Sequence, residues 1–363
     1  MPHNPESILK KIEYGEPVEG IDLSGMDFSG KDLSHGVFLK IIANETLFSE
    51  AKMEKACFNE CSFSGSVWKS ARLDQATFND CHFDRNNFEK ILATGSRWVN
   101  SQTTGCSFSG AILEKSSWVK GQIDEATFED ANLEKASFLN VGFGKTDFSR
   151  TKIIKTVFVS PNLSMARFSE TVFQNPIFVK ATLRGLDFSG MDLPMIQASE
   201  SDLSMTRWIG TNLSLANFHK SDLSGAVFDN AIAEKALLSE TVLKKVSSRN
   251  ACFRMASFQR AIMVEADFSG TDLTCSPLNH ADCSRTNFSG ANLSFSDFSH
   301  ANLHGALFQG ALLKRSNLHR VQDMGTDFGR SGRSLAKETD IELAEAENFT
   351  PRLIAQLGES NVD

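Results

Sequence analysis

The sequence predicts an all-β solenoid, a rod built from short turns that stack on one another. From Leu23 to Leu318 nearly every fifth residue is large and apolar, and only seven of these (318−23)/5+1 = 60 positions hold a smaller residue. A period of five fits neither a helix nor a strand. The residue two positions earlier is Ala, Cys, Ser, Thr, Gly or Val at 49 of the 60 positions. One large and one small inward residue per five would fill a narrow core, and each unit must stack on its neighbours to bury them.

The large residues fall into four columns when positions twenty residues apart are grouped. The column that begins at Phe28 is aromatic at 14 of 15 positions, and the column that begins at Phe38 is aromatic at 11 of 15. The other two columns together hold 5 aromatic residues in 30. A four-sided tube whose opposite walls share a residue type, with rings stacked along the axis, would show this alternation. The predicted structural core of the first column is Phe28, Phe48, Trp68, Phe88, Phe108, Phe128, Phe148, Phe168, Phe188, Trp208, Phe228, Phe268, Phe288 and Phe308.

Segments such as Thr-Asn-Phe-Ser-Gly at 286–290 and Ala-Asp-Phe-Ser-Gly at 266–270 resemble the pentapeptide-repeat family, whose pattern is A(D/N)LxX. The resemblance runs over residues 21–320 without an insertion. It implies a right-handed quadrilateral β-helix with one pentapeptide on each face, so that 300/20 gives about 15 coils. At roughly 4.8 Å per coil the rod would be about 70 Å long. The start of the chain, with Ile-Leu-Lys at 8–10, Gly-Glu-Pro at 15–17 and Gly-Ile-Asp-Leu-Ser-Gly at 20–25, is also similar to the entry segment of pentapeptide-repeat proteins associated with bacterial type VI secretion.

Short helical segments are expected at both ends of the rod. Asn4 is placed as an N-cap before Pro5, and Gly15 would end the helix, so residues 1–20 are predicted to be an N-terminal capping helix. An open solenoid end exposes backbone and core, which makes capping the expected role. Residues 21–330 form the predicted β-helix.

Residues 331–363 are predicted to be a C-terminal helical tail, with one helix from Ser334 to about Asn348 and a second that begins at Thr350-Pro351. The candidate partner-binding residues lie on one side of the second helix: Leu353, Ile354 and Leu357. Two roles stay open for this tail. It covers the last coil, or it extends outward and pairs with another molecule, including a second copy of the chain as a homodimer.

Composition and charge exclude several classes of protein. Residues 21–320 hold 31 Lys and Arg against 32 Asp and Glu, a net charge of −1, whereas nucleic-acid binding would need a dense basic stripe. No stretch approaches 18 consecutive apolar residues, so no membrane association is expected. The first twenty residues lack the apolar core of a signal peptide, and the seven irregularly spaced cysteines favour a reducing compartment. These features predict a cytoplasmic protein.

No catalytic motif, cofactor site or metal site is predicted. His280 and His300 occupy the same outward position on neighbouring coils, with His304 and His319 near in sequence, but no third metal ligand is evident on that wall. The Asp residues that recur just before a large residue, such as Asp187 and Asp267, are expected to form hydrogen bonds at the turns.

Two stretches keep the count of five but lose the preferred residue types, at 86–105 and 186–200. In the second stretch Leu186 and Met191 occupy the small position, where a large side chain would push a wall outward. Each stretch is either tolerated drift in a long repeat or a surface altered for binding.

The leading functional hypothesis is a non-enzymatic protein-interaction scaffold or adaptor in a bacterial cytosol, linked to secretion through the resemblance of its first residues. The alternative is a modulator of DNA gyrase or topoisomerase that imitates DNA, as some members of the family do. The tube is long enough for such imitation, but its net charge of −1 departs from a strongly acidic rod. An enzyme or metal protein that uses the histidines is the third hypothesis, and we do not adopt it.

Overall fold

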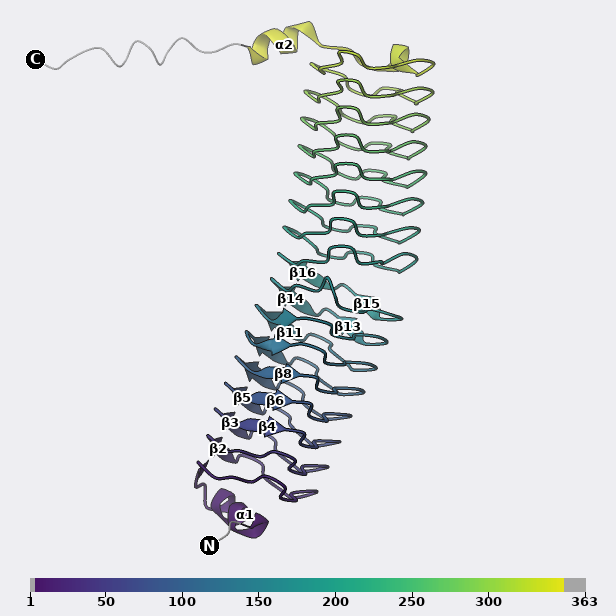
Figure 1. The fold of residues 1–363 in the computed structure, drawn as a ribbon. Coiled ribbons are helices and arrows are strands. Elements are labelled where there is room, and N and C mark those ends of the chain that lie inside the picture. The colour runs from purple at the N-terminus through teal and green to yellow at the C-terminus, as the bar shows by residue number, and fades with distance from the viewer. Residues whose placement is uncertain (1–3, 349–363) are drawn as a thin grey trace, which may run out of the picture.

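The computed structural model describes residues 4–348, which form a rod of stacked coils with a helix at each end (Figure 1). All β pairing in this part of the chain is parallel and joins residues twenty apart, from Val18 with Phe38 to Asn317 with Lys337. A turn follows each group of five residues, so every coil has four faces. The β-helix predicted from the sequence is confirmed, with its period of twenty.

Short strands build the walls of the N-terminal half: β1 (Val18–Glu19), β2 (Val37–Leu39), β3 (Cys57–Asn59), β4 (Ser62–Ser64), β5 (Thr77–Asn79), β6 (His82–Asp84), β7 (Arg97–Val99), β8 (Gln102–Thr104), β9 (Ser117–Val119), β10 (Gln122–Ile123), β11 (Ser137–Leu139), β12 (Gly142–Phe143), β13 (Lys152–Ile154), β14 (Val157–Val159), β15 (Val172–Gln174) and β16 (Ile177–Val179). They form a nine-stranded sheet in the order β1-β2-β3-β5-β7-β9-β11-β14-β16, a five-stranded sheet β12-β10-β8-β6-β4, and the pair β13-β15. Beyond β16 the ladders continue as single bridged residues between turns, such as Asp202 with Asp222.

The core runs along the axis of the rod. All fourteen residues of the predicted aromatic core point inward and are at most 7% exposed. Their rings stack from coil to coil; Phe108 and Phe128, for example, have centroids 4.8 Å apart and planes 6° apart. Side-chain hydroxyl groups at the small inward position form hydrogen bonds inside the rod. For example, Thr151 Oγ1 donates to the carbonyl of Phe128 at 2.7 Å. The three other positions were expected to face water, but Ser149, Ser204 and His319 are exceptions at 4–5% exposure.

The corners of the rod share one backbone conformation. On nearly every face the residue two positions after the large core residue has a positive φ, such as 56° at Lys115 and 53° at Lys180. The preceding Asp or Asn side chain completes the turn, since Asp187 Oδ1 accepts from the N–H of Ser189 at 2.9 Å and Asp267 Oδ1 accepts from that of Ser269 at 3.0 Å. The expected turn-bonding role of these carboxylates is confirmed.

At the N-terminal end, α1 (Pro5–Glu13) lies against the first coil. The Asn4 side chain accepts from the N–H of Ser7 at 2.9 Å and begins the helix. Ile8 is fully buried, and Leu9 and Ile12 pack against the core. The helix therefore covers apolar surface that the first coil would otherwise expose.

At the C-terminal end, the prediction of a helix from Ser334 is wrong. A short 3-10 turn, η1 (Arg333–Leu335), is followed by extended backbone in which Lys337 pairs with Asn317, and only then does α2 (Ile341–Glu347) begin, capped by Asp340. Pairing with the last coil keeps Lys337 from being helical. The second predicted helix and Leu353, Ile354 and Leu357 lie outside the described residues. No helix among residues 4–348 is long and apolar enough to cross a membrane.

The two irregular stretches differ. Around 86–105 the ladder is intact, because Ile91 at the small position is followed by Ala93 at the large one, and both are buried. In the stretch from 186 to 195 the ladder to the preceding coil is broken, as described below.

Candidate protein-interaction surface

One corner of the C-terminal half carries exposed apolar side chains on nearly every coil. We call this set the apolar ridge: Met195, Leu215, Met255, Cys275 and Phe295 at the corner, flanked by Ile232, Leu237 and Leu312. The methionines, Leu215 and Phe295 of the corner are 47 to 53% exposed. Corner residues lie twenty apart, one coil from the next, and Lys235 interrupts the series once. Five coil spacings between Met195 and Phe295 give the ridge a length of about 24 Å.

The fold does not require apolar residues at this corner. In the N-terminal half the same corner holds polar residues or glycine: His35, Lys55, Gln75, Gly95, Lys115, Lys135, Lys155 and Asn175. Polar and apolar residues adopt the same backbone conformation there, with φ of 56° at Lys115 and 61° at Phe295. The change from polar to apolar is therefore a property of the surface, and contiguous exposed apolar side chains mark interaction sites.

Unpaired basic side chains surround the ridge. Lys235, Arg254, Lys314 and Arg315 are exposed, and none of them forms an ion pair within residues 4–348. The Arg315 guanidinium lies 6.0 Å from the centre of the Phe295 ring. Basic residues on another corner are paired, as in Lys220 with Glu240 at 3.7 Å. Acidic side chains next to the ridge oppose part of this charge: Glu234 is exposed, and Asp272 and Asp297 are half-buried.

The ridge was not predicted from the inward positions, which are large and apolar along the whole rod. It becomes visible in the sequence when the corner positions twenty residues apart are grouped, because they turn apolar at Met195.

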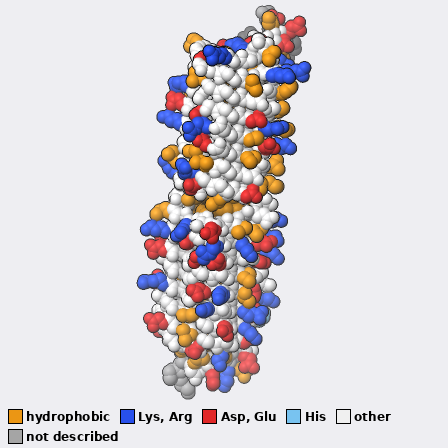
Figure 2. Space-filling model, turned by 90° about the vertical axis from the view of Figure 1, so that its right-hand side faces the viewer, with side chains coloured by type: hydrophobic (Ala, Val, Ile, Leu, Met, Phe, Trp, Pro, Cys, Tyr) orange, Lys and Arg blue, Asp and Glu red, His pale blue; other side chains and the backbone are white. Residues whose placement is uncertain are grey.

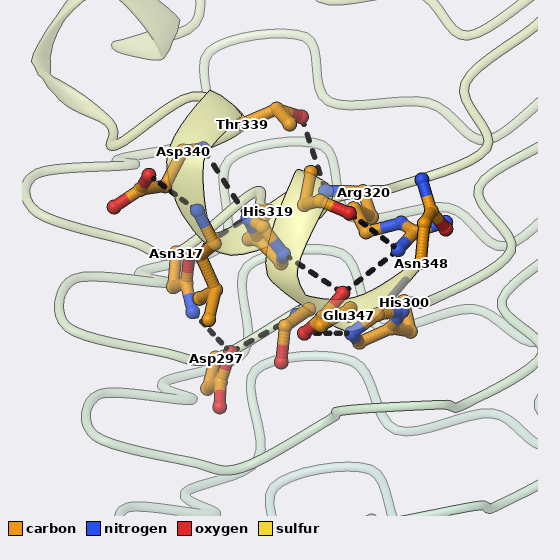
Figure 3. A network of polar contacts seen from close by, with 12 residues as sticks. Asp297, His300, Asn317, His319, Arg320, Thr339, Asp340, Glu347 and Asn348 are labelled. Atoms are coloured by element: carbon orange, nitrogen blue, oxygen red, sulfur yellow. Dashed lines mark hydrogen bonds and ion pairs between the residues drawn. The ribbon is translucent and has the colours of Figure 1, made fainter. Parts of the chain in front are cut away.

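Two of the four histidines noted in the sequence, His300 and His319, meet α2 at the C-terminal end (Figure 3). Glu347 contacts three side chains of the last coils: Nε2 of His300 at 3.2 Å, Nε2 of His319 at 3.4 Å and Nη1 of Arg320 at 2.9 Å. Burial would raise the pKa of Glu347, but the hydrogen bonds from Arg320, His319 and His300 outweigh it and lower the pKa. His280 only stacks on His300, with ring centroids 4.8 Å apart, and His304 bonds to its neighbour Asn302.

The potential ligand atoms of His300, His319 and Glu347 lie within 4.8 Å of one another, which raises the question of a metal site. The backbone N–H of Asp340 donates to Nδ1 of His319 at 3.2 Å, so the proton of the neutral ring must sit on Nε2. That proton points at Glu347, whose charge Arg320 already balances. The cluster is therefore a hydrogen-bonded clamp that holds α2 on the rod, and the sequence could not show Glu347 as its partner.

No serine or cysteine side chain hydrogen-bonds to a histidine ring within residues 4–348, so the nucleophile and base pairing of a hydrolase is not formed there. All seven cysteines are free. The buried Cys106 and Cys283 thiols have raised pKa values because of desolvation, to about 12 for Cys106, which disfavours the reactive thiolate.

Comparisons with known proteins agree with this architecture. Family models of pentapeptide repeats match residues 199–232, 221–259, 251–282 and 281–320, and a second model of such repeats matches residues 48–91. These matches confirm pentapeptide repeats in residues 48–91 and 199–320, as the sequence predicts.

Solved structures that are similar to the chain include the following three proteins. A pentapeptide repeat protein from the thylakoid lumen of Arabidopsis thaliana is 28% identical over 23% of this chain and 63% of its own length, with a TM-score of 0.20. QnrB1, a plasmid-mediated fluoroquinolone resistance protein, is 18% identical over 76% of this chain and 90% of its own, with a TM-score of 0.26. HetL, which is involved in heterocyst differentiation regulation in the cyanobacterium Nostoc, is 18% identical over 86% and 96%, with a TM-score of 0.17. Among curated proteins, none matches the chain.

Proposed function

We propose that the chain is a non-enzymatic interaction scaffold whose C-terminal half binds another protein along the apolar ridge. The observation that carries this proposal is the change of one corner from polar to mostly apolar halfway along the rod. Exposure of hydrophobic side chains to water is unfavourable. A partner that covers these half-exposed side chains on successive coils would therefore bind with a favourable free energy.

The unpaired basic residues define the partner further. A convex ridge with Lys235, Arg254, Lys314 and Arg315 beside it fits a protein that has an apolar groove rimmed by acidic residues. The apolar groove would supply most of the affinity, and the charges would set the register and accelerate association.

The proposed setting is the cytoplasm of a bacterium, in association with a type VI secretion system. This part rests on the first residues of the chain, and the free cysteines agree with a reducing compartment. A homodimer through the C-terminal tail, with Leu353, Ile354 and Leu357 as contacts, stays a separate proposal.

Modulation of gyrase through imitation of DNA is the weaker proposal, because the surface of residues 4–348 has no continuous acidic wall. Positive and negative side chains alternate over the face shown in Figure 2. Many pair along the corners from coil to coil, as Lys180 does with Glu200 at 3.6 Å and Lys245 with Glu265 at 3.8 Å.

The test compares two double variants in a pull-down from the native host. Leu215→Ser with Phe295→Ser removes two ridge side chains, and Met165→Ser with Met205→Ser removes equally exposed side chains on the diagonally opposite corner. Each lost ridge contact should weaken binding of the captured protein about tenfold or more, measured with purified components by calorimetry. The proposal is wrong if the opposite-corner variant loses the partner and the ridge variant keeps it.

A further inference from the structure

The β ladder is open on two adjacent faces near the middle of the rod. In a regular coil the amides of Phe168, Glu170 and Phe173 would donate to the next coil, as Phe148 does to the Arg167 carbonyl at 2.8 Å, but none of these three bonds is made. The bridges of Arg167 with residue 187 and of Val172 with residue 192 are missing as well, although all four ladders continue on both sides.

The other two faces stay closed at the same level. The amide of Leu163 donates to the Thr182 carbonyl at 2.8 Å, and the amide of Phe178 donates to the Gln197 carbonyl at 2.6 Å. The coils are thus joined along one side and parted along the other. We call the parted side the split, between residues 166–175 and 186–195.

Side-chain volume explains the split. Ile91 and Ile196 also occupy the small inward position, but alanine at the large position offsets each of them, at Ala93 and Ala198. Ile21 precedes Leu23 and Met26 precedes Phe28 on the first coil, which has no coil before it to move away from. Leu186 precedes Phe188 and Met191 precedes Leu193, so both inward positions are large on two neighbouring faces. Because a close-packed core cannot absorb the extra atoms, the coil moves away from the one before it.

Packing and shape around the split agree with this cause. The Phe168 and Phe188 rings lie 6.3 Å apart and 32° from parallel, whereas Phe148 and Phe168 lie 5.3 Å apart and 6° from parallel. Leu186 and Met191 are only partly buried. The axis of the N-terminal coils is inclined to that of the C-terminal coils near β15 and β16 (Figure 1), and hydrophobic side chains form a band across the middle of the rod (Figure 2).

We propose that the split is a bending joint, in which the two bonded faces act as the hinge and the two open faces let the halves of the rod change their mutual angle. The inference goes beyond the proposed function, because it concerns the relation between two surfaces. The basic corner of Lys115, Lys135 and Lys155 lies before the joint, and the apolar ridge begins after it at Met195. Bending turns the ridge relative to the basic corner.

Spin labels on one corner test the joint directly. Labels at positions 115 and 215 span the split, and labels at 55 and 155 are also 100 residues apart on the same corner but span closed coils only. Both pairs should give mean distances of about 24 Å. Labels attached through non-canonical amino acids avoid the seven native cysteines. The spanning pair should give a distance distribution at least about twice as broad as the control pair; equal widths would overturn the proposal.

Two variants test the cause. Leu186→Ala with Met191→Thr restores small residues and should narrow the spanning distribution to that of the control. It should also raise the amide-exchange protection of residues 166–175 by about a hundredfold or more. Ala126→Leu with Ala131→Met places the same side chains before Phe128 and Leu133, a matched Phe and Leu pair. This variant should open a second split and broaden the 55–155 distribution. No narrowing in a folded restored variant, or no broadening in the second variant, would show that paired large residues do not make the joint.

Discussion

Phe148→Ala is the substitution that probes the packed axis of the rod most cleanly. Phe148 is fully buried, and its ring stacks on Phe128 and Phe168 with centroid distances of 5.3 Å to each. Loss of its burial costs about 1.5–3 kcal/mol, and loss of two ring pairs costs about 0.5–1.5 kcal/mol each. The variant should therefore lose about 3–5 kcal/mol of unfolding free energy, as Phe-to-Ala changes in packed cores do.

Two further variants calibrate this number in urea denaturation. Phe168→Ala should cost roughly 1 kcal/mol less than Phe148→Ala, because Phe168 is 7% exposed and its stack toward Phe188 is already loosened. Leu139→Ala removes a side chain that is 40% exposed and should cost under about 1 kcal/mol. Amide exchange should locate the loss near the substituted coil, since each repeat contacts only its neighbours. Equal losses for Phe148→Ala and Leu139→Ala would refute the assignment of the inward face.

Four other outcomes are expected. The pKa values of Asp22 and Asp27 are lowered by hydrogen bonds from the serines two residues on, so their contribution to stability is present above the ordinary pKa of 3.8 and is lost as the pH falls through the lowered values. Replacing both by Asn should keep the turns and reduce the acid sensitivity of the first coil, measured by exchange at several pH values. Lys115→Val should cost about 1–3 kcal/mol because Lys115 has a positive φ, whereas Lys115→Gly should be tolerated, as thermal melting will show. Truncation before residue 331 should expose Phe328 and promote aggregation in light scattering, because Arg333 covers its ring at 4.2 Å, whereas truncation after Lys337 should leave the end paired. In a supercoiling assay, submicromolar protein should neither inhibit nor protect gyrase; either effect would favour the alternative function.

Much of the fold could be predicted because the repeat constrains each residue twice. A core position such as Phe108 must fit the small residue beside it and the rings of Phe88 and Phe128 above and below. The period of five residues therefore predicts which side chains point inward, and the grouping of residue types predicts the twenty-residue coil. The positive φ at the corners could also be predicted from the sequence, because no Val, Ile or Thr occurs among the corner residues with this conformation. Side chains branched at Cβ are strained there.

The ends and the split could not be predicted in the same way. The turn from Lys337 into α2 depends on pairing with Asn317 and on the clamp around Glu347, which are contacts between residues far apart in sequence. Large residues at Leu186 and Met191 indicated an altered wall, but whether the coil repacks or separates depends on the volume of both inward positions together.

The most direct measurement of the central claim is site-specific photo-crosslinking in the native host. A photoreactive amino acid at Met255 places the probe on the ridge, and the same probe at Lys115 places it on the same corner in the basic half. A third probe at Met205 tests the diagonally opposite corner, where the side chain is 56% exposed. The account predicts one discrete protein adduct from position 255 and none from 115 or 205. The same adduct from 115 or 205, with none from 255, would contradict the assignment of the ridge as the binding surface.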